Sequence, residues 1–209
     1  GRSARMVSRS CTTRTEAVNR PRHYWTTSRR LGLRKRSWRC LDQNDLRGMN
    51  TPGGSLRLAI EHAHPMLRLV TDAVASEAPA PGKWCPKEII GHLLDSANNN
   101  LARFIRLQST AHLLFEPYAQ VEWVQAQSYS QADWSELIEL WARYNLHIAR
   151  VIDLVPDDAR FRPRREHRPL GSIYAPLPAD GIPTLDWLMR DYVEHLKHHL
   201  RQIDPRLTG

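Results

Sequence analysis

"WCPKEIIGHLLDSANNNLARFIRLQ", residues 84–108, carries the clearest helical pattern in the chain. Pro86 suits the first position of a helix, and Glu88 stands where a capping box places its carboxylate. Cys85 occupies the cap position that Ser or Thr usually takes. Apolar residues recur at spacings of three and four and form one broad face: Ile89, Ile90, Leu93, Leu94, Ala97, Leu101, Phe104 and Ile105. The pattern predicts an amphipathic helix that buries this face.

Helical periodicity also marks three other segments, residues 55–78, 130–156 and 184–203. The residues expected to cap them are, in chain order, Ser55, then Ser130 or Asp133, then Thr184. Four helices of about 20 residues, with no strand pattern of comparable length, predict an all-α four-helix bundle with long inter-helix loops. Long loops at the end of a bundle often cover a site.

The first 48 residues differ in composition from the rest. They hold 13 Lys and Arg against 3 Asp and Glu, a net of +10, whereas residues 49–209 hold 17 against 19, a net of −2. Without apolar periodicity, residues 1–48 are expected to be a disordered basic leader, and residues 49–209 the folded body. Three interpretations of the leader compete: an organellar transit peptide, a basic arm that touches nucleic acid, or non-native sequence translated ahead of a true start at Met49.

Composition limits the class of protein further. The body lacks the roughly 18 to 20 consecutive apolar residues of a membrane helix, and because it is slightly acidic it is not expected to bind nucleic acid. Of the three cysteines only Cys85 lies in the body, which excludes a disulfide framework or a multi-cysteine zinc site there. A cytoplasmic protein with a small-molecule substrate fits best, and a homodimer is left open.

Histidines cluster in "DYVEHLKHHLRQI", residues 191–203. His195 and His199 are four apart, so both side chains leave one face of the helix and can chelate one metal ion. With ten histidines in the chain, chance alone can produce such a pair. His198 points about 100° away from His199 and is expected to face solvent.

A polar flank in residues 84–108 supplies a partner for this pair. Five polar residues repeat at spacings of three and four beside the apolar face: His92, Asp95, Ser96, Asn99 and Asn100. Buried polar groups cost free energy unless they are paired, and a metal or polar ligand would satisfy several of them together. For His92 alone, a hydrogen-bonded histidine near the surface is the alternative interpretation.

The sequence resembles the DinB-like superfamily of metal-binding four-helix bundles in two segments, "KWCPKEIIGHLLDSANNNLARFIRL" and "YVEHLKHHLRQI". The resemblance covers nearly all of residues 55–203 and is strongest for the metal-dependent hydrolases and thiol-dependent S-transferases. It implies one metal-binding histidine on the second helix and two on the last, which here are His92, His195 and His199. Cys85 departs from the usual Ser or Thr cap, and no catalytic residue aligns in the loop of residues 161–183.

The resemblance implies a catalytic rather than a structural metal. Three neutral imidazoles leave coordination positions of a divalent ion open. Such an ion lowers the pKa of a bound water toward about 7, which favours hydrolysis, or deprotonates a low-molecular-weight thiol, which favours thiol transfer. Zinc and nickel are the expected metals, although iron and manganese also accept imidazole. A non-catalytic metal-binding or stress-response protein is the alternative.

Other polar residues of the body are weaker candidates. Asp95, one turn from His92, could orient a ligand or act as a catalytic base, or it could be an exposed helix carboxylate. The loop before the last helix holds a basic cluster that could bind an anionic substrate or form a solvated face: Arg162, Arg164, Arg165, His167 and Arg168. Neither group decides the reaction.

Overall fold

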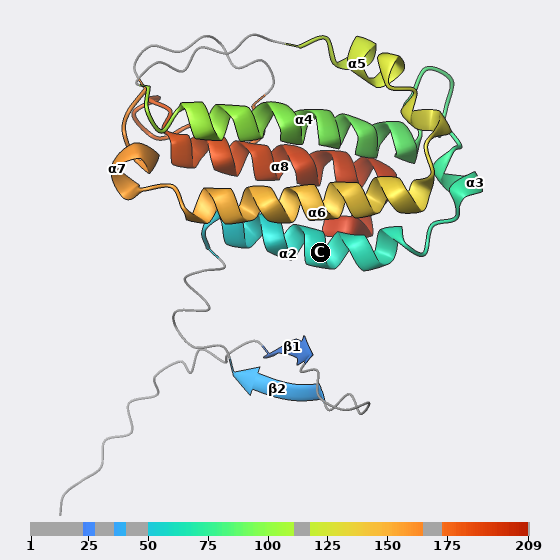
Figure 1. Cartoon of the computed structure of the whole chain (residues 1–209), viewed down its shortest axis with the longest axis horizontal. Helices are drawn as coiled ribbons and strands as arrows, with labels where there is room; N and C mark the ends of the chain where they lie inside the picture. Colours follow the sequence, from blue (N-terminus) through green and yellow to red (C-terminus); the bar gives the residue numbers. More distant parts are fainter. Residues whose placement is uncertain (1–22, 28–35, 41–49, 111–117, 165–172, 209) are drawn as a thin grey trace, which may run out of the picture. The chain divides into compact units, whose positions relative to one another are not determined.

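The computed structural model describes residues 23–27, 36–40, 50–110, 118–164 and 173–208. Two compact units divide the chain, Gly1–Asp45 and Leu46–Gly209. The described helices all belong to the second unit (Figure 1). None of them is long and apolar enough to cross a membrane.

In the first unit, two short strands form an antiparallel pair. They are β1 (His23–Thr27) and β2 (Arg36–Cys40), with Trp25 opposite Trp38. These strands were not predicted from the sequence, where the leader was expected to be disordered. Aromatic and β-branched residues in "HYWTT" favour extended backbone, but five residues are too few to show a clear alternating pattern.

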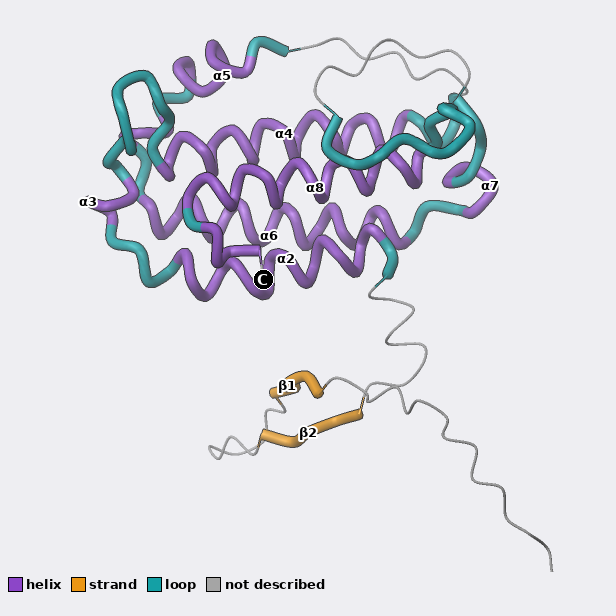
Figure 2. The backbone as a smooth tube through the Cα atoms, turned by 180° about the vertical axis from the view of Figure 1, so that it is seen from behind, coloured by secondary structure: helices purple, strands orange, loops and turns teal. Residues whose placement is uncertain are grey.

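Four long helices of the second unit lie side by side as a bundle (Figures 1 and 2). They are α2 (Pro52–Leu67), α4 (Pro86–Arg106), α6 (Trp134–Asp153) and α8 (Leu185–Ile203). α2 and α4 each pack against both α6 and α8. The predicted all-α four-helix fold is confirmed. One residue of the predicted apolar face, Ile105, is exposed instead, because it lies about 100° around α4 from the buried Phe104.

The predicted starts of three helices are confirmed. The carboxylate of Glu88 accepts a hydrogen bond from the backbone N–H of Cys85 at 2.9 Å, at the start of α4. Asp133, rather than Ser130, caps α6 and accepts the N–H three residues further on at 2.9 Å. Thr184 caps α8 in the same way at 3.1 Å. These contacts are local, so spacing along the chain predicted two of the starts and limited the third to two candidate caps.

The start of α2 differs from the prediction. Thr51, not Ser55, is its N-cap, and the Thr51 hydroxyl accepts the N–H of Gly54 at 3.0 Å. The two glycines that follow the cap disfavour a helix interior, which is why the earlier start was missed. Gly53 has a tertiary reason, because a Cβ there would lie 2.9 Å from the backbone carbonyl oxygen of Ala149 in α6 as well as 2.2 Å from a carboxylate oxygen of Asp153.

The connections between the long helices are partly helical. α2 ends at Leu67 instead of reaching residue 78, and the short α3 (Asp72–Ala75) follows it. The connection from α4 to α6 holds α5 (Gln120–Ala126) and the 3₁₀ turn η1 (Tyr129–Gln131). The remaining short elements are α7 (Asp157–Arg160), before α8, and η2 (Pro205–Thr208), after it.

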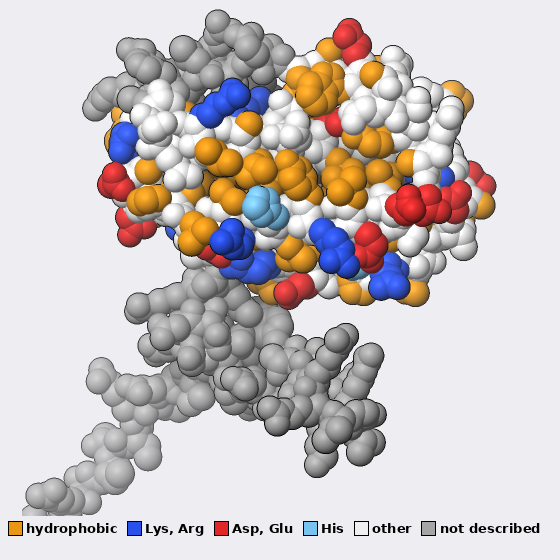
Figure 3. Space-filling model, viewed as in Figure 1, with side chains coloured by type: hydrophobic (Ala, Val, Ile, Leu, Met, Phe, Trp, Pro, Cys, Tyr) orange, Lys and Arg blue, Asp and Glu red, His pale blue; other side chains and the backbone are white. Residues whose placement is uncertain are grey.

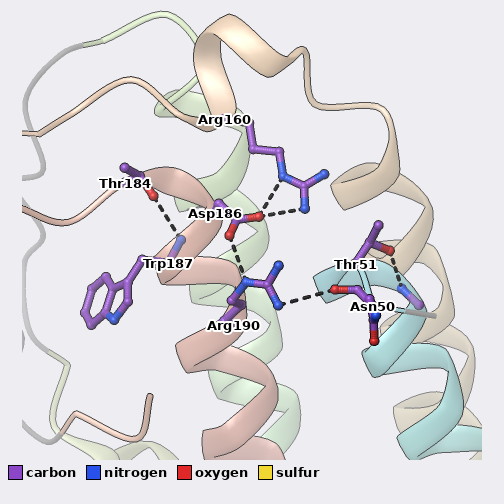
Figure 4. Close-up of polar contacts among 8 residues, drawn as sticks. Asn50, Thr51, Arg160, Thr184, Asp186, Trp187 and Arg190 are labelled. Atoms are coloured by element: carbon purple, nitrogen blue, oxygen red, sulfur yellow. Dashed lines mark hydrogen bonds and ion pairs between the residues drawn. The ribbon is translucent and has the colours of Figure 1, made fainter. Parts of the chain in front are cut away.

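A network of charged side chains connects the elements at one end of the bundle (Figure 4). Asp186, near the start of α8, is 9% exposed. It accepts hydrogen bonds from Nε of Arg160 at 2.7 Å and from Nε of Arg190 at 2.8 Å. Arg190 also donates to the carbonyl oxygen of Asn50 at 3.3 Å. Both carboxylate oxygens are therefore used, and they join α7, α8 and the segment before α2.

Apolar side chains gather across the middle of the bundle face that Figure 3 shows, with charged side chains toward its borders. Among the described residues, the exposed large apolar side chains include Ile105 of α4 and Leu140 and Leu146 of α6. Exposed apolar residues are normal on a protein surface and do not by themselves establish an interface between two copies of the chain. The homodimer that the sequence left open stays a prediction.

Candidate metal centre

Three histidines from two neighbouring helices meet inside the bundle. His92 comes from α4, and His195 and His199 come from α8. One ring nitrogen of each lies within 4.8 Å of the others, and Nε2 of His92 is 3.3 Å from Nε2 of His195. His92 is fully buried, His199 is 8% exposed, and His195 is half-buried. The structure thus brings together all three histidines that the sequence selected.

The packing of α8 explains how the histidines meet. Tyr192 and Leu196 are buried in the core and fix the rotation of α8 about its own axis. His195 and His199 then leave α8 at the border with α4, one turn apart, with ring centroids separated by 4.6 Å. The ring centroid of His92 lies 4.6 Å from that of His199. The third histidine therefore joins the pair only because α4 packs against α8.

Burial keeps the three imidazoles neutral. Loss of water, followed by the nearby charge of His199, lowers the pKa of His92 to about 3. The same causes, together with the charges of the neighbouring histidines, lower the pKa of His195 to about 2. Burial also lowers the pKa of His199, and its hydrogen bond to Gln202 opposes this shift. Because neutral imidazole is the form that binds metal ions, all three rings are available as ligands at neutral pH.

The donor set fits a divalent ion. Two imidazole nitrogens, each about 2.0 to 2.1 Å from one ion at a tetrahedral angle, lie about 3.3 Å apart, as Nε2 of His92 and of His195 do. Within the described ranges, no carboxylate or thiol belongs to the group. Three neutral nitrogen donors leave open positions for water or substrate, as in catalytic zinc sites.

Polar side chains contact the outer nitrogens of the α8 pair. Nδ1 of His199 lies 2.9 Å from Oε1 of Gln202, and Nδ1 of His195 lies 3.4 Å from Oγ of Ser96. Ser96 also accepts a hydrogen bond from Nδ2 of Asn100 at 3.2 Å. Ser96 and Asn100 belong to the polar flank found in the sequence. Gln202 was missed, although its spacing of three from His199 on one helix was an available signal.

His198 lies outside the three-histidine group, as predicted, but it is half-buried and does not simply face solvent. Its ring centroid lies 5.1 Å from that of Tyr174, whose ring is also 4.9 Å from that of His195. Asp191 places Tyr174, because its Oδ1 accepts the Tyr174 N–H at 2.6 Å. The loop before α8 thus returns to cover the histidines, which periodicity alone does not predict.

Two more aromatic rings line the group on the side of α4. The ring centroid of Trp84 lies 5.1 Å from that of His92, and that of Tyr118 lies 6.5 Å from it. Trp123 of α5 packs on Tyr118 with a centroid distance of 5.1 Å. Burial, followed by the charge of Asp95, raises the pKa of Tyr118. Tyr118 follows the end of α4 by twelve residues, so helical periodicity gave no signal for its contact, and Trp84 lies just before the cap of α4, outside the helical pattern.

Asp95 points into the protein. It is 3% exposed, and its Oδ1 accepts hydrogen bonds from Nε2 of Gln127 at 2.7 Å and from the hydroxyl of Tyr129 at 2.9 Å. Its Oδ2 is buried and has no partner in the part of the chain described, and burial raises the pKa of Asp95. Tyr129 lies on Gly91, where a Cβ would come within 2.1 Å of the ring. The interpretation of Asp95 as an exposed carboxylate is therefore wrong.

Arg164 contradicts both interpretations of the basic cluster, because it is fully buried. Its guanidinium donates to the carbonyl oxygens of Leu107, at 2.7 Å, and of Thr110. These residues follow α4, so the cation satisfies carbonyl groups at the negative end of that helix. Arg162 pairs with Asp158 at 3.3 Å. The rest of the cluster lies outside the described residues: Arg165, His167 and Arg168.

A four-helix bundle with a buried three-imidazole group between two helices defines the class of this protein. Residues 48–203 match the model of the DinB superfamily, and the chain belongs to that superfamily. The resemblance found in the sequence is thereby confirmed. A comparison with curated proteins gave no match.

Two solved structures are similar to this chain. One is YfiT from Bacillus subtilis, described as "a probable metal-dependent hydrolase with an unusual four-helix bundle topology". It has a TM-score of 0.57 and 19% identity, and the match covers 79% of this chain and 87% of that one. The other, a mycothiol-dependent maleylpyruvate isomerase, has a TM-score of 0.53 and 17% identity over 73% of this chain and 59% of that one. At these identities the likeness concerns the fold.

Proposed function

We propose that the protein is a metal-dependent enzyme that acts on a small molecule by thiol S-transfer or by hydrolysis, with His92, His195 and His199 as metal ligands. The observation that carries the proposal is the meeting of three neutral imidazoles from α4 and α8, two of them buried and one half-buried. A divalent ion held there would supply a Lewis acid with open positions that activates a water or a thiol. Zinc and nickel are the first candidates, followed by iron and manganese.

The two similar structures support one reaction each. The description of YfiT as a probable metal-dependent hydrolase supports hydrolysis. The mycothiol-dependent isomerase supports a low-molecular-weight thiol as the second reactant. We include a cytoplasmic location in the proposal, because the buried Cys85 is a free cysteine, which is usual in a reducing compartment.

Aromatic residues of the chain exclude water from the histidines, and a carboxylate one helical turn from His92 is a candidate proton acceptor. Trp84, Tyr118 and Tyr174 contact the imidazole rings and limit the access of bulk water, which strengthens electrostatic interactions. Asp95 is our candidate for the catalytic carboxylate. Its Oδ2 has no described partner, and a raised pKa brings a carboxyl group closer to the range useful for proton transfer.

Metal content tests the site. The full-length protein is expected to hold one divalent ion per chain, and the His195→Ala/His199→Ala variant to hold none. His147→Ala, which removes an exposed histidine of α6, is the matched control and should keep the ion. Equal metal content in the parent and the double variant would contradict the proposed centre.

Activity assays separate the reactions. The metal-loaded protein is incubated with thiols plus an electrophile, and separately with esters and amides. Product in the first assay supports thiol transfer, and product in the second supports hydrolysis. Asp95→Asn should lower the active reaction by about 100-fold while the metal content stays the same. No product in any assay would favour the non-catalytic metal-binding or stress-response alternative.

A further inference from the structure

Gln202 lies near the end of α8 and contacts two histidines of that helix. Its Oε1 is 2.9 Å from Nδ1 of His199, and its Nε2 is 3.1 Å from Nε2 of His198. An amide oxygen only accepts hydrogen bonds, and an amide nitrogen only donates them. In this arrangement His199 must carry its proton on Nδ1, and its Nε2 keeps a lone pair.

The opposite orientation of the same amide would have the opposite effect. The amide nitrogen would then donate to Nδ1 of His199, and the proton of that ring would move to Nε2. Because Nδ1 is engaged by Gln202, Nε2 is the nitrogen left to His199 for an ion that it shares with His92 and His195. A protonated Nε2 has no lone pair for a metal ion. The orientation of one amide therefore decides whether His199 is competent as a ligand.

We propose that Gln202 is a positioning residue of the metal centre, because its amide holds His199 in the tautomer that presents Nε2 to the ion. This inference rests on the proposed function only in that an ion binds the three histidines. The contact of His195 with Ser96 is longer, 3.4 Å, and a hydroxyl can donate or accept, so Ser96 does not dictate a tautomer. The control of tautomer by an outer partner is thus strongest at His199.

Substitutions at Gln202 separate this role from a general effect on the fold. Gln202 is exposed, so its replacement should leave the core intact. Gln202→Leu removes both contacts, and we expect zinc affinity to fall about tenfold to a hundredfold, as is typical when an outer partner of a ligand is lost. Gln202→Glu keeps an acceptor for the Nδ1 proton and should retain the affinity. Gln125→Leu, at an exposed glutamine of α5, is the matched control and should change nothing.

His198→Ala provides an independent test, because it leaves Gln202 in place but removes the partner that orients its amide nitrogen. We expect the amide to flip more freely and zinc affinity to fall by less than in Gln202→Leu.

The experiment measures two properties of the full-length proteins. Zinc affinity is obtained by competition with a chromophoric chelator, and the tautomer of His199 is obtained from ¹⁵N NMR of the metal-free protein. The parent and Gln202→Glu should show the Nδ1-protonated form, and Gln202→Leu a mixture. Parental affinity or a parental tautomer in Gln202→Leu overturns the inference, as does an equal loss of affinity in Gln125→Leu. If the parent protein binds no zinc, the proposed function is contradicted as well. If the parent binds zinc tightly and Gln202→Leu binds it equally well, only this inference is contradicted.

Discussion

Two polar clusters on α8 differ in whether the protein itself supplies charged partners for their polar atoms. Near the start of the helix, Asp186 is charged, and both of its oxygens are paired with arginines, Arg160 and Arg190. Further along, His195 and His199 meet His92, and one nitrogen of each ring lies within 4.8 Å of the others, with no charged partner in the group among the residues described. Three neutral nitrogen donors that converge in this way can be satisfied together by one cation. The difference separates a structural cluster from a candidate functional one on the same helix.

The largest expected effect is on stability, at Asp186. Asp186→Ala leaves Arg160, whose side chain is 13% exposed, without its anion, and should lower the free energy of unfolding by about 3 to 5 kcal/mol. Urea denaturation measures the change, and zinc affinity should stay the same. Asp158→Ala, which breaks an exposed ion pair with Arg162, is the control and should cost less than about 1 kcal/mol. Similar decreases in the free energy of unfolding for the two variants would mean that the Asp186 cluster does not stabilise the bundle more than an exposed ion pair does.

The histidine group should affect stability chiefly through its ligand. Zinc at about 100 times its dissociation constant should raise the free energy of unfolding by about 2.7 kcal/mol, because only the folded chain holds the ligands together. Urea denaturation with and without zinc measures the increase, which His195→Ala/His199→Ala should abolish. Equal stabilisation of the parent and this variant would place the zinc elsewhere on the chain.

Without metal, the histidine group should make stability depend on pH. An unfolded histidine binds a proton near pH 6.5, whereas the pKa of folded His195 is lowered to about 2. The unfolded chain therefore binds more protons as pH falls below about 6.5, and each such histidine lowers stability by about 1.4 kcal/mol per pH unit. Urea denaturation between pH 7 and pH 5 should show a shallower decline in His195→Ala than in the parent. Parallel profiles across this window would contradict the lowered pKa.

The smallest expected effect is at Ser96. Ser96→Ala removes the 3.4 Å contact with His195, but not the ring itself, and should weaken zinc binding by less than about tenfold. Chelator competition measures it beside Gln202→Leu. A larger loss at Ser96 than at Gln202 would reverse the order in which we rank the two outer contacts.

Local patterns predicted most of the fold and the three histidines. The four long helices follow from apolar residues at spacings of three and four. Thr184 was predicted as a cap, and Asp133 was one of two candidates with Ser130, because the partner of a cap lies only three residues away. One helical turn indicated the pair His195 and His199, and a polar flank beside an apolar face indicated His92, but the choice of these three as ligands came from the resemblance to the DinB-like superfamily. In each case the signal lies within one helix.

The remaining features depend on contacts between elements far apart in the chain. Gly53 is required by the close approach of the backbone carbonyl of Ala149 in α6, and Asp95 is buried because Gln127 and Tyr129 fold back onto it. Arg164 is buried because it meets carbonyl groups that follow α4. The pattern within a single helix does not show which residues of other elements will contact it. Burial and hydrogen bonding at these positions were therefore predicted wrongly or not at all.

The sequence by itself determined that this chain forms an all-α bundle and carries His92, His195 and His199 on two helix faces, because side-chain direction along a helix is periodic. Only the tertiary structure decided that the three rings share one buried space, with aromatic rings around them and Gln202 behind His199. The physical reason is that loss of water, which keeps the imidazoles neutral, and the choice of tautomer both come from neighbours that packing brings together.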